Sequence, residues 1–225
     1  MGETKLVNQK TVRFSTAPWY KPGIPVIIGG LGTIGSWLSL FLGRQECELH
    51  LFDMDTIEEA NMAGQFYLNN DIGFTKVAAT STHIFAFSEN TQVYEYEEYK
   101  KNSLKDKYMF SCFDNLEARK LMFENWCTVQ GKDKIFIDGR LNAENLDVFF
   151  VTPDRIQQYK NDLYDDTQIE PLVCSFKSTS HCGAMCAGVR HHPGSAGRVL
   201  ATVDRRHGRA AGSSAQGDPG VYDRG

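Results

Sequence analysis

The sequence predicts an α/β protein with a Rossmann-like fold, built on a mostly parallel sheet with helices on both faces. Two observations lead to this prediction. Short apolar segments alternate with segments whose apolar residues recur at helical spacing, and the first apolar segment runs directly into a glycine-rich turn that opens a helix. Helices that connect neighbouring strands favour parallel pairing, and ligands of such sheets bind at the carboxyl ends of the strands.

The individual elements follow in order between residues 25 and 151. Strands are predicted where short runs are apolar or alternate between apolar and polar residues, at 25–30, 47–53, 92–99, 108–113, 135–138 and 146–151. Helices are predicted where apolar residues recur every three or four positions, at 33–44, 75–87 and 116–129. The glycines and polar residues between these segments mark the turns.

Composition places the chain among folded proteins. It has 225 residues, a formal net charge of −4 and 41% hydrophobic residues, and it has no apolar run of the roughly 20 residues that cross a bilayer. The charged amino terminus lacks the apolar stretch of a secretory signal. We therefore expect a cytoplasmic protein that does not enter a membrane, with its six cysteines reduced.

The composition changes near residue 187, which predicts three parts. These are an amino-terminal segment (1–23), a folded domain (24–186) and a disordered, compositionally foreign tail (187–225). The tail holds six of the eleven arginines and eight of the twenty glycines, and it has no Phe, Ile or Lys. If the tail is foreign, the domain is truncated at its carboxyl end. The tail is basic, but it lacks interleaved aromatic residues, so nucleic acid is not an expected partner.

A glycine-rich loop indicates a nucleotide site. Gly30, Gly32 and Gly35 form a G-x-G-x-x-G pattern directly after the first strand and at the start of a helix, where backbone N–H groups can meet a phosphate. Asp53 ends the second strand and can accept hydrogen bonds from ribose hydroxyls. These residues fit NAD as well as ATP, and a tight turn without a ligand is the structural alternative.

Five further positions separate the two nucleotides. Asp55 and Asn61 follow the second strand, Lys76 begins the second helix, and Asp114 with Asn115 follows the fourth strand. A lysine at this edge offers a positive charge to phosphates, and Asp114 offers a carboxylate to Mg²⁺. Hydride transfer requires neither group, so the set favours ATP and Mg²⁺ over an NAD(P)-dependent oxidoreductase.

Each of these residues also has a structural interpretation. Lys76 could be a solvated helix residue, and Asp114 could cap the helix that follows it. Arg119, one turn into that helix, could then be its partner on the surface.

The segments GGLGTIG, LFDMDTIEEAN, GFTK and CFDNLEAR together resemble, over residues 24–186, the ThiF/MoeB/HesA family and the adenylation domain of ubiquitin-activating enzymes. The resemblance implies an ATP-dependent adenylyltransferase that activates the carboxyl-terminal glycine of a small ubiquitin-like or sulfur-carrier protein, acting as a homodimer or heterodimer. It also implies roles for the matching residues: Gly30, Gly32 and Gly35 at the phosphates, Asp53 at the ribose, Asp55 and Asn115 in nucleotide binding, Asn61 and Lys76 at the polyphosphate, and Asp114 at the metal, with Lys76 and Asp114 catalytic.

The sequence departs from the family pattern at several places. Gly64 stands where the family has the arginine of an N-x-x-R-Q segment, which leaves a catalytically inactive partner subunit as an alternative. Arg140 is one candidate for the missing charge. Cys174 lies near the position of a family cysteine that accepts the acyl group or forms a persulfide. No C-x-x-C pair is present, and Cys182 and Cys186 are better explained as buried helix residues, so zinc is not expected.

Overall fold

The structure is a computed structural model that describes residues 13–18, 20–142, 145–164, 198–204 and 209–211. Its strands form one sheet in the order β3-β2-β1-β4-β5-β6-β7-β8. Strands β3 to β5 pair in parallel, and from β5 onward the pairing is antiparallel. The predicted α/β class and Rossmann-like arrangement are confirmed.

The described elements have the following bounds. The strands are β1 (Pro25–Gly29), β2 (Glu48–Phe52), β3 (Val93–Tyr96), β4 (Tyr108–Ser111), β5 (Ile135–Asn142), β6 (Asn145–Val151), β7 (Arg198–Asp204) and β8 (Arg209–Ala211). The α-helices are α1 (Gly35–Gly43), α2 (Lys76–Phe87), α3 (Leu116–Cys127) and α4 (Ile156–Tyr164), and short 3₁₀ turns span Glu59–Asn61, Asn69–Asp71 and Pro153–Arg155. No helix in these described ranges is both long and apolar enough to span a membrane.

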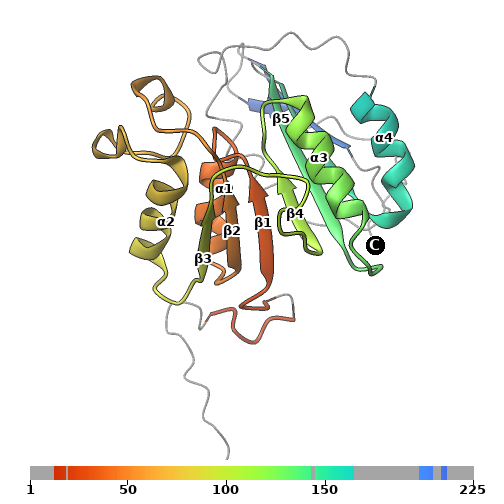
Figure 1. Cartoon of the computed structure of the whole chain (residues 1–225), viewed down its shortest axis with the longest axis horizontal. Coiled ribbons are helices and arrows are strands. Elements are labelled where there is room, and N and C mark those ends of the chain that lie inside the picture. The colour runs from red at the N-terminus through yellow and green to blue at the C-terminus, as the bar shows by residue number, and fades with distance from the viewer. Residues whose placement is uncertain (1–12, 19, 143–144, 165–197, 205–208, 212–225) are drawn as a thin grey trace, which may run out of the picture.

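The sheet buries apolar residues on both faces. On β1, Val26 and Ile28 belong to the core that α1 and α2 cover, whereas Ile27 belongs to the core beneath α3 and α4. This alternation follows from the two-residue period of a strand. In Figure 1, α3 crosses in front of β4 and β5, and α1 lies behind β1 and β2. A strand buried on both faces reads as a continuous apolar run, which is why PVIIG predicts β1.

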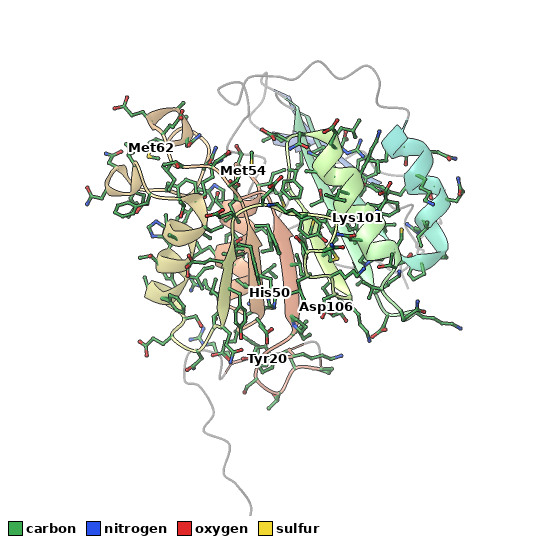
Figure 2. The ribbon with its side chains drawn as sticks, in the orientation of Figure 1. Tyr20, His50, Met54, Met62, Lys101 and Asp106 are labelled. Carbon is green, nitrogen blue, oxygen red and sulfur yellow. The ribbon has the colours of Figure 1, made fainter. Side chains whose placement is uncertain are left out.

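The register of the parallel strands brings several carboxyl ends to one edge. Gly29 lies opposite Phe52 of β2 and opposite Ser111 of β4, and Ser111 lies opposite Asp138 of β5. The loops after β1, β2 and β4 therefore leave the sheet side by side. Figure 2 shows Met54, two residues after the end of β2, at this edge, and His50 and Tyr20 toward the opposite end of the sheet.

The helix starts at this edge differ in their caps. The Thr75 side chain caps α2 by accepting from the Ala78 N–H, and the Asn115 side chain caps α3 by accepting from the Ala118 N–H at 2.8 Å. At the start of α1, Ile34 provides no side-chain cap. In α1 the Ser36 N–H donates instead to the backbone carbonyl of Gly32 at 3.1 Å.

The structure differs from the sequence prediction in its carboxyl-terminal half. The predicted strand 135–138 extends to Asn142, because its second half pairs antiparallel with β6. Helix α4 was not predicted. Two segments of the predicted disordered tail are the strands β7 and β8, and the remaining tail residues lie outside the described residues. The proposed domain boundaries stay predictions.

Candidate functional site

The three glycines of the loop after β1 meet different surroundings. Gly30 has a φ of +86°, and a Cβ there would lie 2.8 Å from the backbone of Cys112 and Phe113. A Cβ on Gly35 would lie 1.8 Å from the Gly30 carbonyl oxygen, whereas a Cβ on Gly32 would meet nothing within 4 Å. The fold therefore requires Gly30 and Gly35. The space next to Gly32 is open to an approaching group.

Asp53 ties the glycine loop to the end of β2. Its Oδ2 accepts the Leu31 N–H at 2.6 Å, and its Oδ1 accepts the Asp55 N–H at 2.9 Å. The side chain is 8% exposed. Burial raises the pKa of Asp53, and the positive charge of Lys76 opposes this shift. The predicted position of Asp53 at the strand end is confirmed, and its role toward ribose stays a prediction.

Lys76 is a buried cation and not a solvated helix residue. Its side chain is 7% exposed, and its Nζ lies 2.6 Å from Asp55 Oδ2 and 3.9 Å from Asp53 Oδ1. The Lys76 backbone N–H also donates to the Asp55 carbonyl at 2.9 Å, which fixes the start of α2 against the end of β2. Since the Asp55 side chain is 56% exposed, one partner of this buried ammonium faces solvent.

Asn61 lies in the loop between β2 and α2 and makes a local contact. Its Oδ1 accepts the Glu58 N–H at 2.9 Å, so the amide oxygen is engaged in the 3₁₀ turn. Three residues later the Gly64 carbonyl accepts from Trp37 Nε1 of α1 at 3.2 Å. The segment in which the family pattern has arginine is therefore held against α1. The predicted contact of Asn61 with a polyphosphate stays a prediction.

Tyr67 connects the same loop to the glycine turn. Its hydroxyl donates to the Leu31 carbonyl at 2.8 Å and lies 3.3 Å from Thr80 Oγ1 of α2. The Phe66 N–H donates to Ser36 Oγ at 3.0 Å. Burial raises the pKa of Tyr67 well above its usual value, so the phenol stays protonated. Sequence reasoning assigned Tyr67 no role, because no local pattern links an aromatic loop residue to a backbone carbonyl 36 positions away.

Asp114 and Asn115 occupy the turn between β4 and α3, and both are exposed. Because Asn115 caps α3, the alternative in which Asp114 is the cap is wrong. Asp114 lies three residues after Ser111, the last residue of β4. Ser111 pairs with Gly29, the last residue of β1, so the turn with Asp114 and the glycine loop leave the sheet side by side. Its place at this edge agrees with the prediction. Its role toward a metal is untested.

Arg119 is buried and not a surface residue. Its Nη1 donates to Asp138 Oδ1 and, at 3.2 Å, to the Gly139 carbonyl. Asp138 is fully buried, and its Oδ2 accepts from Arg140 Nε at 2.7 Å and from the Tyr159 hydroxyl at 2.8 Å. The sequence analysis assigned Asp138 no role, because no local pattern indicates that a carboxylate at the end of an apolar segment binds both Arg119 and Arg140.

The described residues thus place the glycine loop, Asp53, Asp55 and Lys76 in direct contact at one edge, with Asp114 at the same edge. Cys174 lies outside the described residues, as do Cys182 and Cys186. Within the described part, no group of three or more His, Cys, Asp or Glu side chains is arranged to hold a metal by itself. A profile of the ThiF family matches residues 24–189. The chain belongs to the ThiF family.

Solved structures share this fold at low sequence identity. PaaA is 17% identical with a TM-score of 0.59, and the match covers 84% of this chain and 72% of PaaA. Escherichia coli MccB with ATP is 17% identical with a TM-score of 0.58, covering 84% of this chain and 63% of MccB. The microcin C7 biosynthetic enzyme MccB with N-formylated MccA is 16% identical, with a TM-score of 0.59, covering 84% and 64%. This ThiF-family chain therefore spans less than two thirds of MccB. A search of curated protein sequences finds no significant match.

Proposed function

We propose that this ThiF-family protein binds ATP with Mg²⁺ and transfers AMP to the carboxyl-terminal carboxylate of a small ubiquitin-like or sulfur-carrier protein. The proposal rests on one observation above the others. A buried ammonium, Lys76, lies beside Asp53 and Asp55 at the end of β2, next to a glycine loop with open space at Gly32. A buried cation with one solvent-facing partner is suited to an incoming polyanion.

The glycine loop and Asp53 fit a nucleoside phosphate. An open position at Gly32 lets a phosphate reach the backbone, and α1 begins without a side-chain cap on its N–H groups. Each Asp53 oxygen accepts one backbone N–H and retains acceptor capacity for a ribose hydroxyl. The alternative, a tight turn that only connects β1 with α1 and binds no ligand, does not require open space next to Gly32. NAD(P) would share these contacts but has no use for Lys76 or Asp114.

Asp114 fits Mg²⁺ that is held mainly by phosphate oxygens. Mg²⁺ in nucleotide sites is commonly bound by one or two carboxylates together with substrate phosphates and water. Asp114 is exposed and follows β4, which pairs with β1, so it offers one such carboxylate beside the glycine loop. When bound, the metal supplies positive charge that stabilises the phosphate oxygens.

The proposed reaction is a displacement at phosphorus. An oxygen of the acceptor carboxylate forms a bond to the α-phosphorus, the bond to the bridging oxygen breaks, and pyrophosphate leaves with the electron pair. Lys76 stabilises the negative charge that grows on the phosphate oxygens, and the surrounding protein keeps this ammonium in place before the reaction begins. No group of the enzyme has to donate a proton in this step.

The acceptor and the assembly are also part of the proposal. MccB is described in complex with ATP and with MccA, and this likeness supports a peptide or small protein as acceptor. We propose that the protein works in the cytoplasm as a homodimer or heterodimer. In this proposal, Cys174 takes over the acyl group after adenylation.

A second candidate function follows from Gly64. Where the family pattern has an arginine, this chain has a glycine whose carbonyl is engaged by Trp37. A protein without that charge could bind the nucleotide and serve as the inactive subunit of a heterodimer.

ATP–pyrophosphate exchange tests the proposal. The full chain is assayed with Mg²⁺, with and without small proteins that end in Gly-Gly, and compared with Lys76→Ala and Asp114→Ala. Lys132→Ala and Glu97→Ala are matched controls, since both residues are exposed in loops. Acceptor-dependent exchange that is lost only in the first two variants supports adenylation. ATP binding without exchange favours the inactive subunit, and absence of ATP binding refutes the nucleotide site.

A further inference from the structure

The turn that carries Asp114 is fixed at its strand end. Ser111, the last residue of β4, is fully buried and lies between Gly29 of β1 and Asp138 of β5. The Cys112 N–H donates to the Gly29 carbonyl at 2.7 Å. Asp114 follows after one more residue, so the turn leaves the sheet from a backbone position with little freedom.

The helix end of the same turn is fixed by Arg119. This residue is 8% exposed, lies in the first turn of α3, and donates to Asp138 and to the Gly139 carbonyl. Its backbone N–H donates to the Asn115 carbonyl at 3.4 Å. If the start of α3 moved away from β5, the ion pair between Arg119 and Asp138 would break and leave two unpaired buried charges. Unpaired buried charges are strongly destabilising.

Asp138 cannot turn toward another partner without breaking further bonds. Its Oδ2 accepts from Arg140 Nε and from the Tyr159 hydroxyl, while its Oδ1 accepts from Arg119. The Arg140 guanidinium lies over the Phe149 ring, 4.3 Å from its centroid. Three elements, β5, α3 and α4, therefore hold this carboxylate in one orientation.

We infer that the Arg119–Asp138 ion pair is a positioning device that sets Asp114 for the metal of Mg·ATP. The inference rests on the proposed function. Mg²⁺ requires near-ideal octahedral geometry, so a lone carboxylate ligand is effective only if its backbone is held in place. Arg119 and Asp138 act through the turn and touch neither metal nor nucleotide.

Calorimetric titration of ATP, with and without Mg²⁺, tests the positioning role. The ratio of the two affinities reports the contribution of the metal. We expect Asp114→Ala and Arg119→Gln to reduce that ratio by tenfold or more, and we expect Arg119→Gln to leave the metal-free ATP affinity at the wild-type value. Arg119→Lys retains the charge but not the guanidinium nitrogen that reaches both Asp138 and Gly139, and it is expected to fall between Arg119→Gln and wild type.

Lys134→Met is the matched control for α3. Lys134 Nζ donates to the carbonyls of Trp126, Cys127 and Val129 at the far end of the helix, so this variant weakens α3 without touching the Asp114 turn. It should leave the affinity ratio unchanged. Amide exchange provides a readout that does not depend on ligand: Arg119→Gln should accelerate exchange at residues 112–116, and Lys134→Met at the opposite end.

The outcomes are distinguishable. If wild type binds no ATP, the proposed function fails and the inference fails with it. If Asp114→Ala lowers the ratio but Arg119→Gln does not, only the positioning role is overturned. If Lys134→Met lowers the ratio as much as Arg119→Gln does, the pair serves general helix stability and the inference is wrong. Should Arg119→Gln not fold, the same comparison is decided with Arg119→Lys.

Discussion

Replacing Gly32 and Gly35 by alanine separates the functional from the structural need for glycine in the same loop. At Gly32 the added Cβ meets no atom within 4 Å, and its φ lies outside the left-handed region. At Gly35 the Cβ would lie 1.8 Å from the Gly30 carbonyl oxygen. Two substitutions of the same chemistry, three positions apart, should therefore differ in effect: Gly32→Ala should mainly weaken ATP binding, and Gly35→Ala should mainly lower stability.

The magnitudes follow from these contacts. Gly32→Ala should change the free energy of unfolding by less than about 1 kcal/mol, and a small gain is possible because alanine restricts the unfolded chain. Gly35→Ala must displace either the turn or the helix, which costs roughly 1–3 kcal/mol or more. For ATP, the Gly32 Cβ would enter the space that a phosphate needs. Loss of one charge-assisted backbone hydrogen bond, about 1.5–3 kcal/mol, corresponds to a roughly 10- to 150-fold weaker affinity.

Urea unfolding and ATP titration of both variants measure the two quantities separately. We expect Gly32→Ala to unfold like wild type and to bind ATP at least tenfold more weakly, and Gly35→Ala to unfold at lower urea concentration. Wild-type ATP affinity in a folded Gly32→Ala protein would refute the assignment of the glycine loop to a phosphate. Equal destabilisation by both substitutions would refute the structural distinction between the two glycines.

Three further predictions follow from other contacts. Lys134→Met should lower the free energy of unfolding by roughly 2–4 kcal/mol in urea titrations, because three carbonyls at the end of α3 lose a charged donor. If Gly64 is the cause of weak catalysis, Gly64→Arg should raise the exchange rate at least tenfold, and an unchanged rate with unchanged ATP affinity would show that this charge is not limiting. Burial raises the pKa of Cys47 to about 11 from 9.0, so the contribution of this neutral thiol to stability is complete below pH 9 and is lost as the pH rises toward 11. The urea unfolding midpoints of wild type and Cys47→Ala should therefore converge between pH 9 and pH 11. A constant difference between the two midpoints would contradict the pKa shift.

The sequence predicted well the positions of those residues that follow from the local sequence pattern. Gly30, Asp53 and Lys76 each sit where a strand ends or a helix begins, and those boundaries follow from apolar periodicity and from turn residues. The parallel pairing of β1 with β2 then places Asp53 beside the glycine loop, because the two strands end opposite each other. The contact between Lys76 and Asp55 is not foreseen, because it depends on how the loop between β2 and α2 returns Lys76 to the end of β2.

The residues that the sequence did not predict depend on partners far along the chain. Arg119 reads as a surface residue because its partner, Asp138, is 19 positions away on a strand that is otherwise apolar. Tyr67 likewise shows no local sequence pattern for its role, because the Leu31 carbonyl that it binds is 36 positions away. Strand β5 was predicted four residues too short, because the polar segment after Asp138 is stabilised as a strand only by its antiparallel partner β6.

The change from parallel to antiparallel pairing at β5 has a consequence for how the chain folds. Strands β5 and β6 pair from Asn142 opposite Asn145 outward, so this hairpin closes a short loop. Pairing of β1 with β4 instead joins Val26 to Tyr108 and therefore has to close a much longer loop. Contacts that are local in sequence form fastest, so the β5–β6 hairpin should be structured while the nucleotide edge is still open. The slowest part of the fold to assemble is then the part that the proposed chemistry depends on.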